Sequence, residues 1–152
     1  MEITDDMVKR RLSRSHKTDL AYTAGIIDGE GCIGIYPRRN NKTGPRYFGL
    51  RVYVGNTNEW LIKWLWFNYG GSVLKRKVVD NCKEQWAWAL ADKKAYDFLK
   101  LIVPFLHIKR PHAELALKFH NNSFFGRRRT DEDKVLEEAQ YILMRSYNKR
   151  GR

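Results

Sequence analysis

The chain has 152 residues, the size of one ordinary domain, and 43% of them are hydrophobic. That fraction supplies a core and excludes intrinsic disorder over most of the length, while the lack of any run of about 18 apolar residues excludes a membrane span. Lysine and arginine number 29 against 17 acidic residues, and a formal net charge of +12 indicates a polyanionic partner, most often nucleic acid.

The cysteines and the N-terminal residues indicate where such a protein works. Cys32 and Cys82 stand far apart and in no metal-ligand spacing, so neither a disulfide scaffold nor a zinc ribbon is expected. The segment 1–6 is acidic and lacks the apolar region of a secretory signal. We therefore expect an intracellular protein with no membrane partner; an organelle, a nucleus and an archaeal or bacterial cytoplasm are not distinguished.

Helix and strand patterns alternate along the chain. Asn58 and Asp92 are suited to begin helices as N-caps, and Thr130 opens a capping box with Asp133. Gly70-Gly71 is suited to end a helix. In chain order we expect a helix over 20–29 capped by Thr18 or Asp19, strands over 32–36 and 47–55, a helix over 58–69, strands over 72–79 and 85–91, and helices over 93–103, 111–121 and 130–147.

This order predicts an α+β fold, αββαββα with extra C-terminal helices. The strands would form one four-stranded, antiparallel, saddle-like sheet with helices on one face. The other face would be open, polar and basic, and β-ribbons of this kind can lie along a DNA groove. We assign residues 1–17 to a basic N-terminal arm, 18–121 to the core, and 122–152 to a C-terminal helical extension of the same domain.

A glycine-rich segment over residues 21–31 carries the strongest indication of function. Ala21, Gly25 and Gly29 recur every four residues, so a helix places them in one ridge of small side chains. Glycine inside a helix costs about 0.5–1 kcal/mol relative to alanine, and close approach of a second helix backbone is a physical reason to keep it. Asp28 and Glu30 follow at the helix end, where the dipole disfavours anions, and a divalent cation would compensate their charge.

The segment TAGIIDGEG over 23–31 resembles the signature of LAGLIDADG homing endonucleases. The resemblance covers roughly residues 18–121, with Thr23 where the family usually has Leu and Glu30 where Asp is common. It implies a site-specific endonuclease that cuts a long stretch of double-stranded DNA by metal-dependent phosphodiester hydrolysis. Because the chain carries one copy of the signature, it also implies a homodimer, a pseudo-palindromic site, and the small-residue ridge as the dimer interface.

The resemblance further implies roles for individual residues. Glu30 of each copy would meet near the two-fold axis and hold Mg²⁺ with help from the Gly29 carbonyl, and Mn²⁺ or Ca²⁺ can substitute for binding. Asn56 would order water near the phosphate, or else serve only as a turn residue. Lys109 would approach the scissile phosphate or perturb a catalytic water, or else be a solvated lysine before a helix. Asp28 is expected to be a structural hydrogen-bonding group.

Alternation along the predicted hairpins selects the residues that would contact DNA. Ile33 and Ile35 take the parity that faces the helices, and the basic and aromatic residues take the other. Trp86 and Trp88 share one face, and either stack on DNA or pack against the helices. The predicted DNA contacts are Tyr36, Arg38, Asn40, Arg51 and Tyr53 on the first hairpin and Arg76 on the second.

Two other functions are compatible with the same scaffold. One is an RNA-binding maturase, whose partner would be intron RNA, and the other is a non-catalytic DNA-binding regulator. The intact acid at Glu30 argues for cleavage over the maturase. A regulator would bind one site tightly with or without Mg²⁺ and never cut.

Overall fold

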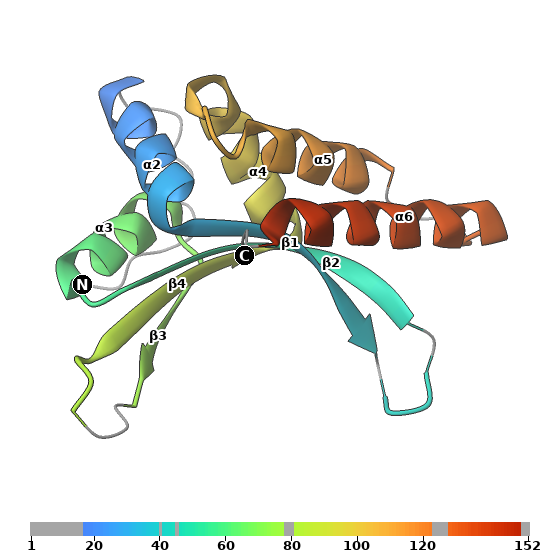
Figure 1. The fold of residues 1–152 in the computed structure, drawn as a ribbon, viewed down its shortest axis with the longest axis horizontal. Helices are drawn as coiled ribbons and strands as arrows, with labels where there is room; N and C mark the ends of the chain where they lie inside the picture. The colour runs from blue at the N-terminus through green and yellow to red at the C-terminus, as the bar shows by residue number, and fades with distance from the viewer. Residues whose placement is uncertain (1–16, 40, 45, 78–80, 123–127, 150–152) are drawn as a thin grey trace.

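A computed structural model describes residues 17–39, 41–44, 46–77, 81–122 and 128–149. The predicted arm up to residue 16, and Asn40 among the predicted DNA contacts, lie outside the described residues. In chain order the elements (Figure 1) are α2 Lys17–Glu30, β1 Gly31–Arg39, β2 Arg46–Asn56, α3 Glu59–Tyr69, β3 Ser72–Arg76, β4 Gln85–Ala91, α4 Asp92–Ile102, the 3-10 turn η1 Val103–Phe105, α5 Arg110–Asn121 and α6 Asp131–Asn148.

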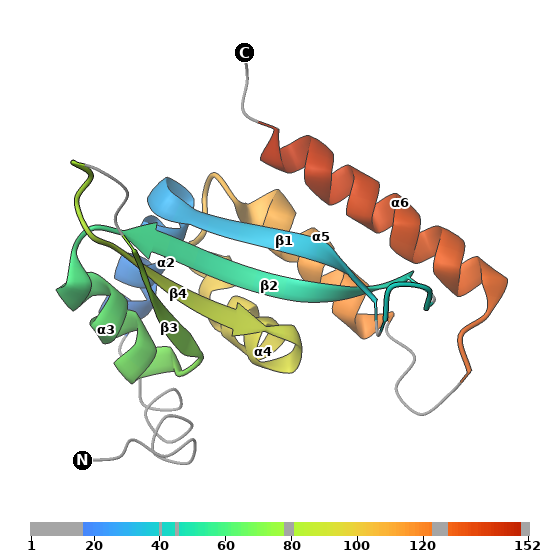
Figure 2. The same cartoon turned by 90° about the horizontal axis from the view of Figure 1, so that it is seen from below.

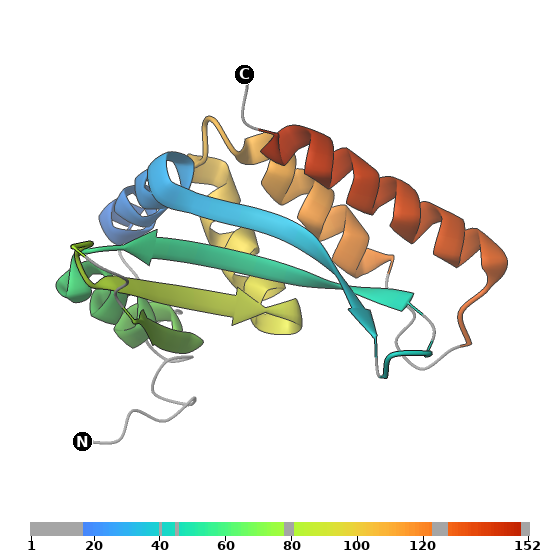
Figure 3. The ribbon, with the colours of Figure 1, turned by 60° about the horizontal axis from the view of Figure 1, so that its bottom comes forward.

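The four strands form one antiparallel sheet in the order β1-β2-β4-β3. The helices cover one face of it, and the two hairpins curve away from them so that the opposite face forms an arch (Figures 1 and 3). The predicted α+β fold, with helices on one face of a four-stranded antiparallel sheet, is confirmed. Successive side chains of a strand point to opposite faces of the sheet, so one alternating set packs against the helices and the other set faces the arch.

The core lies between the sheet and the helices. Ile33 of β1 and Leu50, Val52 and Val54 of β2 are fully buried there, at the parity expected for the helix-facing side. Thr23 of α2 is also fully buried, and its hydroxyl lies 2.7 Å from the Tyr69 hydroxyl on α3. The Thr23 hydroxyl thus adds a polar link between α2 and α3 inside the core. Among the described helices, none is long and apolar enough to cross a bilayer.

Both tryptophans of β4 face the helices. Trp88 is fully buried, and its indole N–H donates to the Gly70 carbonyl at 2.7 Å. Trp86 is half-buried, with the ammonium of Lys63 on α3 5.8 Å from its ring. Of the two alternatives for this pair, packing against the helices is therefore the one observed.

The capping and stop signals at both ends of α3 and at the start of α6 are found where the sequence predicts them. The Asn58 side chain accepts from the Leu61 N–H at 3.2 Å, and Thr130 and Asp133 form a reciprocal capping box. Helix α3 ends at Gly70-Gly71, which have φ of 72° and 89°, a region that glycine adopts without steric cost. These signals are read correctly from sequence because each involves residues within one turn of the helix end.

The structure differs from the sequence expectations at several element ends, among them that of β3, which ends at Arg76 and does not include residue 77. Thr18 and Asp19 already lie within α2, so neither caps it. Strand β1 continues through Pro37, which is tolerated because β1 is an edge strand and a proline there need not donate to the sheet. Ala91 is the N-cap residue of α4, with no side-chain cap hydrogen bond, and Asp92 directs its carboxylate elsewhere.

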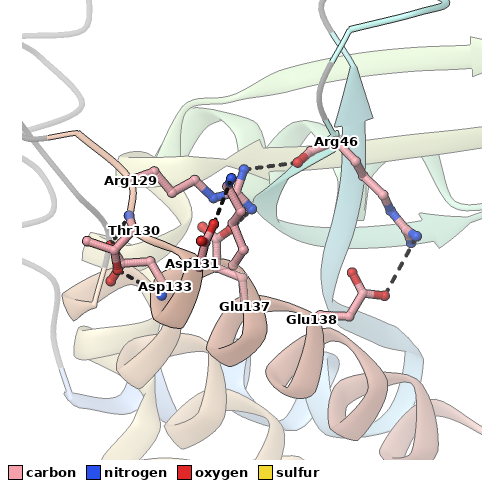
Figure 4. Close-up of polar contacts among 8 residues, drawn as sticks. Arg46, Arg129, Thr130, Asp131, Asp133, Glu137 and Glu138 are labelled. Carbon is pink, nitrogen blue, oxygen red and sulfur yellow. Dashed lines mark hydrogen bonds and ion pairs between the residues drawn. The ribbon is translucent and has the colours of Figure 1, made fainter.

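Helix α6 packs beside β1 and braces the first hairpin (Figures 2 and 4). Arg129, just before α6, pairs with the carboxylate of Glu137 and donates to the Arg46 carbonyl at 2.9 Å. Burial raises the pKa of Glu137, against the opposing effect of Arg129. The Arg46 guanidinium itself lies 3.6 Å from Glu138 and 5.0 Å from the ring centroid of Tyr141. The start of β2 is thereby fixed on its helix-facing side.

Candidate active site and DNA-binding face

The open face of the sheet carries a patch of stacked aromatic and basic side chains. The Arg51 guanidinium lies 5.8 Å from the ring centroid of Tyr36 and 5.2 Å from that of Tyr53. The Arg76 guanidinium, from β3, lies 5.8 Å from the Tyr53 ring. Lys75 has the opposite parity and belongs to the helix side, as expected for one of two adjacent strand residues. Cation–π contacts therefore join residues of three strands on the face predicted to meet DNA.

Small residues let these side chains lie flat on the sheet. The Tyr36 ring lies over Gly34, where an added Cβ would come within 2.6 Å of the ring. Ala87 and Ala89 of β4 stand between β2 and β3 on the open face, where the Arg76 side chain crosses toward Tyr53. Burial, together with the nearby Cys32 thiol, raises the pKa of Tyr36 to about 12. The phenol is therefore neutral near pH 7.

Arg38 lies on the same face but is held by a partner within the chain. It stands opposite Tyr47 in the β1–β2 ladder, at the parity of Tyr36. Its guanidinium forms an ion pair of 2.7 Å with Asp92, and its side chain is 38% exposed. The structure thus places Tyr36, Arg38, Arg51, Tyr53 and Arg76 on one face.

Asp28 fastens the segment before α5 to the end of α2. Its carboxylate accepts from the backbone N–H of His107 at 2.9 Å and of Lys109 at 2.8 Å. Partial burial acts to raise the pKa of Asp28, but these hydrogen bonds and the Lys109 charge outweigh it, so the pKa lies below its ordinary value. The expectation that Asp28 is a structural hydrogen-bonding group is confirmed by these contacts.

The ammonium group of Lys109 binds the end of α2. It donates to the carbonyls of Ile27 at 2.8 Å and Asp28 at 2.7 Å. The last four carbonyls of a helix have no intrahelical partner, and the helix dipole favours a cation there. Burial lowers the pKa of Lys109, although Asp28 acts in the opposite direction. For Asp28, the compensation expected from a metal cation is thus supplied by Lys109 and by backbone N–H groups.

We expect Asp28→Asn to lower the free energy of unfolding by about 1 kcal/mol at pH 7, because an amide offers one acceptor oxygen where the carboxylate offers two. The pKa of Asp28 is lowered in the folded state, so its contribution is present above the unfolded pKa, near 4, and is lost as pH falls through the folded value. Urea unfolding at pH 7 and pH 3 measures this. A difference between wild type and variant that does not shrink at pH 3 would contradict it.

Glu30 and Asn56 come together at the end of α2. Glu30 is exposed, and the Asn56 side-chain amide donates to its carboxylate. The Asn56 side-chain carbonyl accepts from the Asn58 N–H at 2.7 Å, which makes the turn before α3. Asn56 is therefore both a turn residue and a contact of the acid. The pair borders a groove of about 620 Å³, lined by Tyr22, Gly25, Ile26, Glu30, Asn56, Asn58, Trp60 and Leu61.

The small-residue ridge is exposed, and the packing of a single chain does not require its residues to be small. Ala21, Gly25 and Gly29 are all exposed, and a Cβ added at either glycine would meet nothing within 4 Å. Gly31 differs, because a Cβ there would lie 2.8 Å from the Ile27 Cα and 2.9 Å from its carbonyl oxygen. The fold of one chain thus requires glycine at position 31, whereas the ridge glycines have no such role in it.

Exposed aromatic side chains beside the ridge were missed by the sequence analysis. Tyr22 is 51% exposed and Trp60 is 64% exposed, and both line the groove. They flank Trp64, with ring centroids 5.3 Å and 6.3 Å from it. The spacing of Trp60 and Trp64 at i and i+4 is a sequence signal for one aromatic face on α3.

The oxygen atoms at the end of α2 are of the kind that a divalent cation such as Mg²⁺ prefers, but in one chain they are too few to hold it alone. No three His, Cys, Asp or Glu side chains gather as a metal site among the described residues. The Glu30 carboxylate and the neighbouring Gly29 carbonyl are nevertheless hard oxygen ligands, and Glu30 is exposed. Mg²⁺ is characteristically held by one or two carboxylates, water and substrate phosphates rather than by an all-protein cage.

Comparisons with known proteins identify the fold. No family model and no curated relative matches the chain. Among solved structures, the homing endonuclease I-CvuI in complex with its target aligns with a TM-score of 0.73 and 16% identity, over 89% of this chain and 85% of its own. The archaeal intron-encoded homing endonuclease I-Vdi141I, complexed with DNA, aligns with a TM-score of 0.74 and 12% identity, over 91% and 89%.

A third match comes from a longer protein. The LAGLIDADG homing endonuclease I-GzeII, in complex with its DNA target, aligns with a TM-score of 0.57 and 14% identity, over 83% of this chain but 43% of its own. At these identities the likeness establishes the fold. The resemblance carried by residues 23–31 is thus confirmed at that level, and the chain has the fold of the LAGLIDADG homing endonucleases.

Proposed function

We propose that the chain is a site-specific endonuclease that cuts double-stranded DNA at a long pseudo-palindromic site, as a homodimer and with a divalent metal. The observation that carries the proposal is the exposed Glu30–Asn56 pair at the end of a glycine ridge whose Cβ positions are empty. It is supported by the likeness to I-CvuI and I-Vdi141I, homing endonucleases whose structures contain DNA.

The homodimer is supported by the ridge and by the lengths of the matched proteins. Two copies of α2 crossing at Gly25 and Gly29 would fill the space that the missing Cβ atoms leave. The exposed Tyr22 and Trp60 would add apolar area beside that crossing. I-GzeII is matched over 43% of its length and has room for a second such unit, whereas I-CvuI is matched over 85%.

The DNA would lie in the arch of the sheet, against the cationic aromatic patch of Arg51, Arg76, Tyr36 and Tyr53. A dimer would carry a net charge of +24, twice the +12 of one chain. Charge of that size draws duplex DNA to the face through phosphate contacts and makes affinity fall steeply with salt. Base edges in the major groove are within reach of a two-stranded ribbon, so the same face can also select a sequence.

The two Glu30 carboxylates, with the Gly29 carbonyls, would hold Mg²⁺ near the two-fold axis; Mn²⁺ or Ca²⁺ could occupy the same oxygens. When bound, such an ion neutralises charge on phosphate oxygens and lowers the pKa of water at the site. The chain's own residues set the geometry. The Asn56 amide orients the Glu30 carboxylate, and Lys109 fixes the last turn of α2, from which that carboxylate projects.

Arg76→Ala should relax the preference at one base pair in each half-site. Arginine commonly pairs with guanine O6 and N7, and loss of such a pair costs about 1–3 kcal/mol of discrimination. The variant should fold normally because Arg76 is exposed at the end of β3. Competition binding against every single-base variant of the site measures the effect. A uniform loss of affinity across sequences would instead make Arg76 a phosphate contact.

Incubation of the protein with a randomised duplex library, with and without Mg²⁺, followed by sequencing of the cut ends, tests the proposal. We expect Mg²⁺-dependent cutting at one long, near-palindromic sequence. Retention of a specific duplex without cutting would replace the endonuclease by a DNA-binding regulator. Retention of structured RNA, with no DNA selected, would replace it by a maturase.

A further inference from the structure

The first residue of α4 breaks two local rules. Asp is a favoured N-cap residue, yet Ala91 occupies the N-cap position and the helix has no side-chain cap hydrogen bond. Asp92 itself has a φ of 51°, in the left-handed region that few residues other than glycine adopt. A residue that does not cap its helix and holds an uncommon backbone conformation is a candidate for a functional contact.

The Asp92 carboxylate joins two strands instead of capping its own helix. One oxygen accepts from the backbone N–H of Leu50 at 3.2 Å. Because the β2–β4 ladder ends at the pair Arg51–Ala91, this bond extends the ladder by one more step with a side chain. The second oxygen accepts from Arg38 Nη1 at 2.7 Å. The carboxylate is therefore fixed by the backbone of β2 while it holds an arginine of β1.

Gly49 provides the surface on which that arginine lies. A Cβ added at Gly49 would come within 2.5 Å of the Arg38 Cζ and 2.6 Å of its Nε. The guanidinium thus lies directly over the glycine, with Nη1 on Asp92. Its side chain remains 38% exposed on the open face of the sheet. The Asp92 carboxylate thus holds one edge of the Arg38 guanidinium, and Gly49 leaves room for the guanidinium to lie against the sheet.

We propose that Asp92 and Gly49 are positioning residues that hold Arg38 in one orientation to read a guanine in the major groove; this rests on the function proposed above. A guanidinium has five N–H donors, so those not used by Asp92 can pair with guanine O6 and N7. A fixed guanidinium accepts only a base edge of matching geometry, whereas a free one also pairs with phosphates at many positions. The Asp92 charge also repels phosphate. The Asp92–Arg38 pair therefore lowers the affinity for non-specific DNA and raises the selectivity for one base.

Asp92→Asn tests this with little expected change in the fold. Asparagine tolerates a left-handed φ and can still accept from the Leu50 N–H, so the variant removes mainly the charge that holds Arg38. At one base pair in each half-site, discrimination for guanine should fall from about 10-fold or more to under about 3-fold. Affinity for random duplex should rise, because one negative charge per chain is lost. Arg38→Ala should lose the preference at the same base pair.

Two further variants separate charge from position. Asp97→Asn removes an acid from the exposed side of the same helix, where it pairs with Lys93 at 3.0 Å, and should leave base preference unchanged. Gly49→Ala leaves the net charge unchanged but displaces the guanidinium, which can move because it ends a flexible side chain. It should lose the same preference as Asp92→Asn, without the rise in affinity for random duplex.

The measurement is competition binding against single-base variants of the selected site, with the melting temperature of each protein recorded. An Asp92→Asn protein that keeps its preference at every base pair would overturn the inference. So would a uniform drop in affinity together with a lower melting temperature, since Asp92 would then serve the fold alone. A wild-type protein that selects no duplex at all would overturn the proposed function, and this inference with it.

Discussion

Glu30→Gln is expected to lower the rate of DNA cleavage by about a thousandfold or more, with affinity for the target retained. A metal ion at a phosphate contributes several kcal/mol of transition-state stabilisation, and each 1.4 kcal/mol lost is tenfold in rate. A neutral amide is a far weaker ligand for Mg²⁺ than a carboxylate. Loss of about 4 kcal/mol therefore accounts for the expected thousandfold.

The fold and the DNA-binding face should survive this change. Glu30 is exposed, and the glutamine carbonyl can still accept from the Asn56 amide, so its effect on stability should stay within about 0.5 kcal/mol. A dimer of the variant would lose two negative charges, so its net charge would rise from +24 to +26, which favours non-specific DNA binding. The variant thus separates chemistry from binding.

Single-turnover cleavage in Mg²⁺ and equilibrium binding in Ca²⁺ measure the two effects. Glu114→Gln, which removes the same charge from an exposed position on α5, is the matched control and should cut at the wild-type rate. Cleavage by Glu30→Gln within tenfold of wild type would remove Glu30 from the metal site. Loss of binding by Glu30→Gln alone would give it a role in DNA recognition instead.

What could be predicted from the sequence was local. The capping box at Thr130 and the cap at Asn58 involve residues three positions away, and the alternation of Ile33 and Ile35 fixes their common face. Such signals predict the order of helices and strands along the chain, and this order predicts an α+β fold with one sheet. The recurrence of small residues likewise marks the ridge on α2, because it depends only on helical geometry.

What could not be predicted depended on contacts between distant segments. Asp92 is not the cap of α4 because Arg38 and Leu50 hold its carboxylate from strands far back in the sequence. For Lys109 the sequence offered a role at the scissile phosphate or a catalytic water, or plain solvation; it did not predict that the ammonium binds carbonyls of α2, a segment about 80 residues earlier. The spacing of Trp86 and Trp88 puts them on one face, but which face it is depends on the register of β4 against β2, where Trp88 pairs with the buried Val54.

Gly25→Leu is expected to weaken self-association by at least about 30-fold while leaving the fold of one chain intact. A Cβ at position 25 meets nothing within 4 Å in the monomer, and glycine is about 0.5–1 kcal/mol worse than alanine inside a helix. The substituted chain should therefore be at least as stable as wild type in isolation. At a close crossing of two helices, each added side chain instead overpacks the contact, at about 1–3 kcal/mol per site.

A homodimer carries the substitution twice, so its association should weaken by about 2–6 kcal/mol, or roughly 30-fold to 10⁴-fold. Sedimentation over a range of concentrations should find dimer for wild type and an 18.0 kDa monomer for the variant. Cleavage should be lost with the dimer, because one chain supplies one Glu30. A variant that remains dimeric would place the interface elsewhere.

Gly31→Ala is the control that distinguishes loss of folding stability from loss of association. Its Cβ would lie 2.8 Å from the Ile27 Cα, and a backbone atom cannot move aside as a side chain can, so this variant should lose stability as a monomer. Gly31→Ala would then lower the stability of the monomer, whereas Gly25→Leu, six positions earlier, would weaken only the association of two chains. A Gly25→Leu chain that melted below wild type would mean that the ridge serves the monomer after all. Unchanged or increased stability together with a lost dimer would mean that the glycine at position 25 is kept for the second copy.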